Sequence, residues 1–258
     1  MSKKFTNPFE GKKVCLWDIE RFPGVYYGWS SFDNPFSQKE KSSISLICYK
    51  WLGEDEIHTI RLSRLQHRRN PRNELPIIKK MLKVVNEADI LIAYNGDRFD
   101  WKKFNGAVMK HGLEPAKKPK LIDPLKMIKR DTSFDSHRLD DMCKELGVHL
   151  KLSTEKNLFT NSMTDWDKYM DLAEYCRHDI MALESLFKRI SPYLAPVVNI
   201  GSLQNKDKAC ASCGSENLVK FGSYILNSGV ETQRYRCKDC GSTKTRDTAS
   251  GKKTITAI

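Results

Sequence analysis

Residues 14–20, Val-Cys-Leu-Trp-Asp-Ile-Glu, are an apolar run that ends in two carboxylates. A short apolar run of this kind predicts a buried β-strand. Side chains alternate across a strand, so Asp18 and Glu20 should point the same way, about 7 Å apart along the backbone. Two carboxylates this close repel each other unless a proton or a cation lies between them. A strand end with two solvated acids is the simpler interpretation, unless other acids converge on the same place.

A second strand and the helix after it bring a further acid. Residues 90–94 are continuously apolar and Asn95-Gly96 ends the run, which predicts a strand in a sheet covered on both sides. A helix is predicted from about Arg98, with Asp100 in its first turn. Sites in open α/β sheets form at the carboxyl ends of strands, where Asp100 would lie. A helix-start Asp that only favours the helix dipole is the alternative.

A long helix, predicted from residue 164 or 165 to about 190, carries the fourth acid. Tyr175 and Asp179 are four residues apart and share a face that is otherwise apolar. A charged Asp on a core face needs a cation or hydrogen-bond donors. A cluster with the three other acids would supply that need. His178 should point elsewhere and is expected at the surface.

The remaining pattern predicts an α/β fold. A hairpin is expected from strands 44–51 and 56–62, a short strand at 121–123, helices at 75–86 and 137–146, a helical turn at 125–129 and a loop at 152–161. Residues 22–29, rich in aromatic residues, either stack on a nucleic-acid base or pack on the core as a strand. Residues 64–72 are expected to be a basic loop, either solvated or in contact with phosphates.

The composition is that of a globular protein with a polyanionic partner. The chain of 258 residues is long enough for one sizeable core and a small appendage. Its net charge of +12 favours nucleic acid over a membrane surface as the partner, although a merely basic soluble protein is the alternative. We expect neither a signal peptide nor a membrane span, because residues 1–13 lack an apolar segment and no apolar run approaches about 18 residues.

Eight cysteines without a secretory signal indicate reduced thiols or metal ligands in an intracellular, cytoplasmic protein. Four of them form two Cys-x-x-Cys pairs that 23 residues separate: Cys210, Cys213, Cys237 and Cys240. Four thiolates in this pattern hold one structural Zn²⁺, and the alternating segment between the pairs resembles a zinc ribbon. The other four are expected to be small core residues: Cys15, Cys48, Cys143 and Cys176.

Three segments together resemble the Exo motifs of the DEDD 3′–5′ exonucleases. They are residues 18–20 (Asp-Ile-Glu), 94–100 (Tyr-Asn-Gly-Asp-Arg-Phe-Asp) and 175–179 (Tyr-Cys-Arg-His-Asp). The second and third are most similar to the proofreading domains of family B DNA polymerases, and the resemblance covers about residues 12–190. Glu174 stands where the histidine subclass would need His, so the tyrosine subclass is indicated. Arg21 departs from the Thr of many relatives.

The resemblance implies a ribonuclease H-like mixed sheet flanked by helices. It implies that two Mg²⁺ or Mn²⁺ ions bind four acids, Asp18, Glu20, Asp100 and Asp179, and that Tyr175 positions the attacking water. The expected activity is 3′–5′ exonucleolytic hydrolysis of nucleic acid, DNA favoured, to nucleoside monophosphates. Single-stranded DNA or a 3′ end is the expected partner, and a replication or repair protein is a possible second one.

The expected domains are an exonuclease domain at 1–195, a linker at 196–207, a zinc ribbon at 208–246 and a tail at 247–258. Residues 201–258 hold ten Lys and Arg against five Asp and Glu, so the ribbon either binds a nucleic-acid strand or docks a protein. Two other functions stay open. One is a non-catalytic module of the same fold that binds nucleic acid or a replication protein, and the other is a structure-selective endonuclease.

Overall fold

The computed structural model describes residues 7, 9, 11–29, 37–149, 152, 155, 157–194, 199, 201, 206, 208–225, 229 and 231–243. The chain divides into two compact units. The large unit is Lys13–Ile190, and the small unit combines Met1–Lys12 with Ser191–Ile258. The predicted tail at 247–258 lies outside the described residues, as does most of the predicted linker.

A five-stranded mixed sheet forms the centre of the large unit, in the order β5-β4-β1-β6-β7. The strands are β1 (Val14–Phe22), β4 (Ser43–Trp51), β5 (His58–Arg61), β6 (Ile90–Ile92) and β7 (Lys120–Ile122). β4 is antiparallel to both β1 and β5, whereas β1, β6 and β7 run parallel. The predicted mixed sheet and hairpin are therefore confirmed, and β1 lies in the middle of the sheet.

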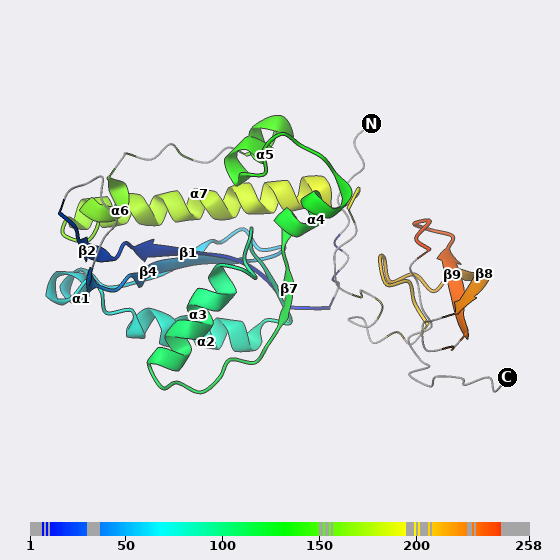
Figure 1. Cartoon of the computed structure of the whole chain (residues 1–258), viewed down its shortest axis with the longest axis horizontal. Helices are drawn as coiled ribbons and strands as arrows, with labels where there is room; N and C mark the ends of the chain where they lie inside the picture. The colour runs from blue at the N-terminus through cyan, green and yellow to red at the C-terminus, as the bar shows by residue number, and fades with distance from the viewer. Residues whose placement is uncertain are drawn as a thin grey trace. The chain divides into compact units, whose positions relative to one another are not determined.

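Helices cover both faces of this sheet, with α7 on one side and α2 and α3 on the other (Figure 1). The helices are α1 (Arg64–Arg69), α2 (Leu75–Glu87), α3 (Asp100–Lys110), α4 (Pro124–Asp131), α5 (Leu139–Glu145), α6 (Leu158–Asn161) and α7 (Trp166–Ile190). Two predicted loops are wrong in part. Residues 64–69 are helical because Ser63 and Gln66 form a capping box, and α6 is a short helix inside the segment 152–161.

Buried contacts fix α7 against the sheet. Tyr169 is fully buried, and its hydroxyl donates to Ser45 O at 2.6 Å and accepts from Leu62 N at 3.1 Å. Lys50 on β4 forms a buried ion pair with Glu184 on α7 at 2.6 Å. Removing one partner of such a pair costs on the order of 3–5 kcal/mol. These contacts at both ends of α7 hold its central turns over β1 and β4.

A second, two-stranded sheet follows β1 directly. β2 (Val25–Tyr27) pairs antiparallel with β3 (Ser37–Glu40), and every residue of β3 is exposed. The alternative that the aromatic residues at 22–29 pack on the core holds only for Phe22, which is fully buried. Tyr26, Tyr27 and Trp29 lie on the surface.

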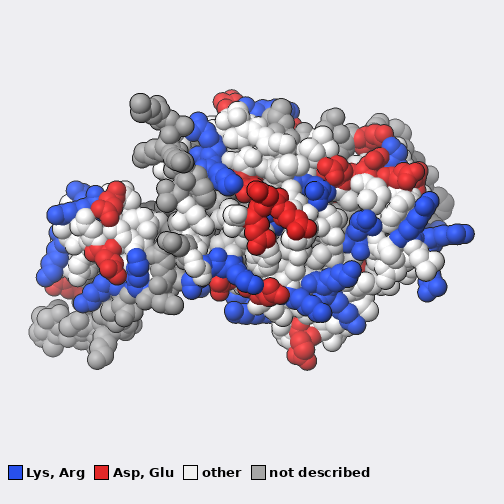
Figure 2. Space-filling model, turned by 180° about the vertical axis from the view of Figure 1, so that it is seen from behind, with Lys and Arg blue, Asp and Glu red and all other residues white. Residues whose placement is uncertain are grey.

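The small unit contains the hairpin of β8 (Leu218–Ile225) and β9 (Glu231–Cys237). Two turns, at residues 210–213 and 237–240, carry the four predicted zinc ligands. Among the described residues, no helix is long and apolar enough to cross a membrane. Figure 2 shows Lys and Arg spread over one face of the molecule between groups of Asp and Glu.

Candidate active site

The central strand β1 places Asp18 and Glu20 on one face. Glu20 is 8% exposed and Asp18 is half-buried. β1 pairs regularly with β4 up to Glu20, and a register shift follows between Glu20 and Arg21. The two carboxylates therefore lie on the regular part of β1, immediately before the register shift, after which the strand continues to Phe22.

Asp100 meets β1 between these two acids. It is the first residue of α3, and its Oδ1 accepts a hydrogen bond of 3.1 Å from the backbone N–H of Ile19. Asp100 is 2% exposed. Burial raises the pKa of Asp100 well above its ordinary value, and the negative charge of Asp18 raises it further. The Asp100 carboxylate is therefore repelled by Asp18, as we expect for Asp18 and Glu20 on the strand.

Cys176 on α7 is the contact that sequence reasoning missed. Its sulfur lies 3.5 Å from Asp18 Oδ2, and one potential ligand atom each from Asp18, Glu20 and Cys176 lies within 4.8 Å of the others. Cys176 is fully buried, as predicted for a core cysteine. Burial raises the pKa of this thiol, and the neighbouring acids raise it too, so Cys176 is a neutral donor to Asp18.

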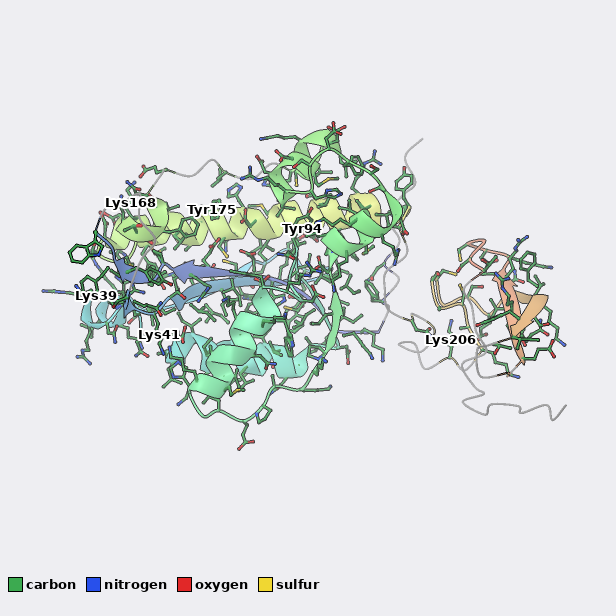
Figure 3. The ribbon with its side chains drawn as sticks, viewed as in Figure 1. Lys39, Lys41, Tyr94, Lys168, Tyr175 and Lys206 are labelled. Carbon is green, nitrogen blue, oxygen red and sulfur yellow. The ribbon has the colours of Figure 1, made fainter. Side chains whose placement is uncertain are left out.

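The other two predicted residues of α7 flank Cys176. Asp179 is one turn further along the helix and 5% exposed. Residues three apart share a helix face, so Asp179 lies on the side of α7 that Cys176 turns to β1. Tyr175 is half-buried, and its ring packs edge-to-face on Phe159 at 6.1 Å. Figure 3 shows Tyr175 on the central part of α7.

Asp123 is a further buried acid that the sequence did not single out. It is 5% exposed, and its Oδ1 accepts hydrogen bonds from Asn95 N at 2.9 Å and Leu125 N at 3.0 Å. Burial raises the pKa of Asp123 to about 6, and the charge of Asp97 adds to the shift. An Asp before a Pro reads as an ordinary helix cap, so only its second bond, to residue 95, reveals that it also holds the turn before α3.

His178 lies at the surface, as expected, but it also contacts another histidine. Its side chain is 23% exposed, and its Nδ1 lies 3.1 Å from Nε2 of His149. The two rings stack, with centroids 5.3 Å apart. His178 therefore links α7 to the segment after α5 and is not a freely solvated side chain.

The buried carboxylates fit divalent cations. Hard oxygen ligands suit Mg²⁺ or Mn²⁺, and the repulsion between neighbouring acids favours a bound positive charge. In the small unit, the sulfurs of Cys210 and Cys240 are 3.6 Å apart, and those of Cys213 and Cys237 are 3.7 Å apart. A tetrahedron with Zn–S bonds of about 2.3 Å has edges of about 3.8 Å, so the four thiols fit Zn²⁺.

Comparison with known proteins identifies the family. Residues 33–191 match the RNase_H superfamily. This chain belongs to that superfamily. The match includes Asp100, Tyr175 and Asp179 and begins after Asp18 and Glu20.

Two DNA polymerases are similar to parts of this chain, one in sequence and one in fold. The chain is 40% identical over 67 residues to a protein of Ureaplasma parvum described as DNA polymerase III PolC-type; this covers 26% of the chain and 5% of that protein. It shares its fold with the family B DNA polymerase of the archaeon Pyrobaculum calidifontis, at 14% identity and a TM-score of 0.55. That match covers 79% of this chain and 26% of the polymerase chain. This chain thus spans only a small part of the length of each of these two proteins.

Proposed function

We propose that this protein is a metal-dependent 3′–5′ exonuclease that hydrolyses nucleic acid, DNA in preference, to nucleoside monophosphates. The observation that carries the proposal is the hydrogen bond from Ile19 N to Asp100, which holds a third acid between Asp18 and Glu20. Membership of the RNase_H superfamily and the similarity to two DNA polymerases support it. The domain limits given above for the nuclease and the ribbon belong to the same proposal.

Four acids would hold two Mg²⁺ or Mn²⁺ ions: Asp18, Glu20, Asp100 and Asp179. Such a pair of ions stabilises the charge on the attacking and leaving oxygens of a phosphodiester. Asp18 lies 3.5 Å from Cys176 on α7, and its charge acts on Asp100 at the start of α3, so it would share the ions with acids from both helices. Glu20 and Asp179 would hold the ion that activates the attacking water. Asp100 would support the ion on the side of the leaving group.

Tyr175 would orient the attacking water or the scissile phosphate through its hydroxyl. Its ring is held by Phe159, at an interplanar angle of 81°. A ring fixed in this way limits the positions of the hydroxyl, which is what a positioning group requires. The neutral thiol of Cys176 would hold the Asp18 carboxylate in place and leave the metal ligation to oxygen atoms.

The small unit would bind one structural Zn²⁺ through its four cysteines. Its hairpin carries Arg236 over the ring of Phe221, at 3.6 Å, which suits contact with a nucleic-acid strand. Single-stranded DNA or a 3′ end is the partner that we propose for the whole chain. A replication or repair protein is the proposed partner if the ribbon docks protein.

The test is digestion of two single-stranded DNAs, a linear strand labelled at the 5′ end and a circular strand labelled within its sequence, with Mg²⁺ and with EDTA. We expect a ladder that shortens from the 3′ end, mononucleotide products, intact circles, and no reaction in EDTA. Asp179→Asn should be inactive, whereas Asp171→Asn, an exposed acid on the same helix, should be active. Cut circles would indicate an endonuclease, and two intact substrates would indicate a binding module.

A further inference from the structure

Three large aromatic side chains are exposed directly after the proposed active-site strand. Tyr26 is 54% exposed, Tyr27 50% and Trp29 89%. Single exposed apolar residues are ordinary, but a group of them marks a binding surface. These three fall within four consecutive positions, six to nine residues after Glu20 along the chain.

The base of this hairpin is firmly held. Arg72 donates to Lys41 O at 3.0 Å and to Pro23 O at 2.9 Å, and its Nε lies 2.7 Å from a carboxylate oxygen of Glu40. Arg21, at the end of β1, donates a hydrogen bond to Ser42 Oγ. One arginine thus clamps both sides of the β2–β3 pair, and a second ties β1 to the segment after β3. The exposed rings therefore project from a fixed support.

The charge beside the rings is positive. The Lys39 ammonium lies over the Tyr27 ring, 5.9 Å from its centroid, and Lys41 follows two residues later. Glu40, the acid between them, is neutralised by Arg72. Figure 3 shows Lys39 and Lys41 at the end of the large unit toward which β1 runs. Aromatic faces next to ammonium groups suit unpaired bases and their phosphates.

We propose that this aromatic wing, made of Tyr27, Trp29, Lys39 and Lys41, binds the single-stranded nucleotides next to the 3′ end that is being cleaved. Tyr26 points to the other face of β2, where its hydroxyl accepts a hydrogen bond from Gln38 Nε2 at 3.2 Å, so it is not part of the wing. The backbone from Glu20 to Tyr27 spans at most about 25 Å. The wing therefore reaches nucleotides only a few positions from the scissile one. The inference that the bound nucleotides lie next to the 3′ end rests on the proposed exonuclease function. Strand binding itself can be measured without cleavage.

Single-stranded nucleic acid fits this surface better than a duplex does. Stacking on an aromatic ring needs an exposed base face, which a duplex shows only at its ends. Stacking is also largely indifferent to sequence, so the wing would hold any strand that the active site shortens. A strand held upstream of its 3′ end would stay bound after each nucleotide is released.

The first experiment measures strand binding by fluorescence anisotropy. The full chain with Asp18→Asn, in a buffer with neither Mg²⁺ nor a chelator so that the small unit keeps its Zn²⁺, is titrated against a fluorescein-labelled single-stranded DNA of mixed sequence. We expect Trp29→Ala and Tyr27→Ala each to weaken binding about 5- to 100-fold, the range that stacking of one base produces. Trp29→Phe should restore most of it. Tyr193→Ala, which removes an aromatic residue that is 59% exposed in the small unit, is the matched control.

The second experiment separates the wing from the active site. The p-nitrophenyl ester of thymidine 5′-monophosphate is too short to reach the wing, so Trp29→Ala should hydrolyse it as the wild type does and digest long single strands more slowly. If both wing variants bind and digest long strands as well as the wild type does, the proposal that the wing binds the strand is wrong. If the wing variants bind the strand more weakly while the wild type hydrolyses neither substrate, strand binding by the wing is supported and the exonuclease proposal fails.

Discussion

The sulfur of Cys176 on α7 lies 3.5 Å from Oδ2 of Asp18 on β1. Burial and the adjacent acids raise the pKa of this thiol, so it is a neutral hydrogen-bond donor. The same sulfur lies 3.7 Å from the backbone carbonyl of Asp18. A single side chain thus fixes both the carboxylate and the strand that carries it. Groups that orient a metal ligand in this way tune metal binding without touching the metal.

Cys176→Ala should therefore raise the Mg²⁺ concentration at half-maximal activity by about 10- to 100-fold, the range found for groups that support metal ligands. Activity at saturating Mg²⁺ should fall less, because all four acids remain. The measurement is a Mg²⁺ titration of exonuclease rate. Cys15→Ala, also fully buried and on β1, controls for the lost core volume. Equal Mg²⁺ dependence of both variants would limit Cys176 to packing.

Asp100→Asn should separate stability from activity. The amide oxygen of Asn can still accept the bond from Ile19 N, so α3 keeps its place on β1. The substitution removes a buried charge that Asp18 repels. In EDTA at pH 8, we expect the free energy of unfolding to rise by about 1 kcal/mol, or about 2–4 °C in Tm. Exonuclease activity should fall more than about 100-fold.

Thermal unfolding followed by circular dichroism checks the first half of this prediction. Asp55→Asn, at an exposed position between β4 and β5, provides the comparison for a carboxylate outside the site. A clear loss of stability in Asp100→Asn would mean that the charge of Asp100 is satisfied by the fold itself. The need for a cation, inferred from the repulsion between the acids, would then disappear.

The strands and helices around the site follow from local patterns in the sequence. The apolar run before Asp18 and the one at 90–92 become the neighbouring parallel strands β1 and β6. The spacing of Ile78, Met81 and Val85 predicts the buried face of α2. These features depend on periodicity alone, and periodicity can be read from one sequence. The predicted helix start near residue 98 was two residues early, because the turn at 94–99 holds the chain until Asp100.

Contacts between distant segments could not be predicted in this way. Cys176 is an apolar-looking residue on an apolar face, and only the crossing of α7 over β1 brings it to Asp18. Asp123 acquires its raised pKa from burial and from Asp97, which lies on a different loop. Side-chain type says nothing of such neighbours. The exposure of Tyr27 and Trp29 likewise depends on where the β2–β3 hairpin leaves the sheet.

Zinc removal should affect the small unit alone. Cys240 is exposed, so Cys240→Ser removes a ligand without opening a core. We expect one Zn²⁺ per purified wild-type chain and a large loss in Cys240→Ser, measured by elemental analysis after dialysis. Folding of small zinc modules depends on the metal, whereas the large unit has its own core. The thermal transition of the large unit should therefore be the same in Cys240→Ser as in the wild type. Cys15→Ala, the control, should retain its zinc. Full zinc content in Cys240→Ser would remove this cysteine from the ligand set.

Asp123 should make stability depend on pH between about 4 and 6. Its pKa is about 6 in the folded chain and about 3.9 in an unfolded one. In this window the folded state holds a proton that the unfolded state has lost, so stability falls as the pH rises through it. Asp123→Asn keeps the acceptor oxygen for Asn95 N and Leu125 N and does not titrate.

The difference in Tm between Asp123→Asn and the wild type should accordingly grow from pH 4.5 to pH 7, in EDTA. Distant groups titrate alike in both proteins, so the difference reports Asp123 together with Asp97, the acid that is hydrogen-bonded to it. The measurement is calorimetric unfolding at four or five pH values. A difference that stays constant would show that Asp123 is already ionised at pH 4.5. The turn at Asn95 would then be held by a charged carboxylate, and the pKa shift attributed to burial would be wrong.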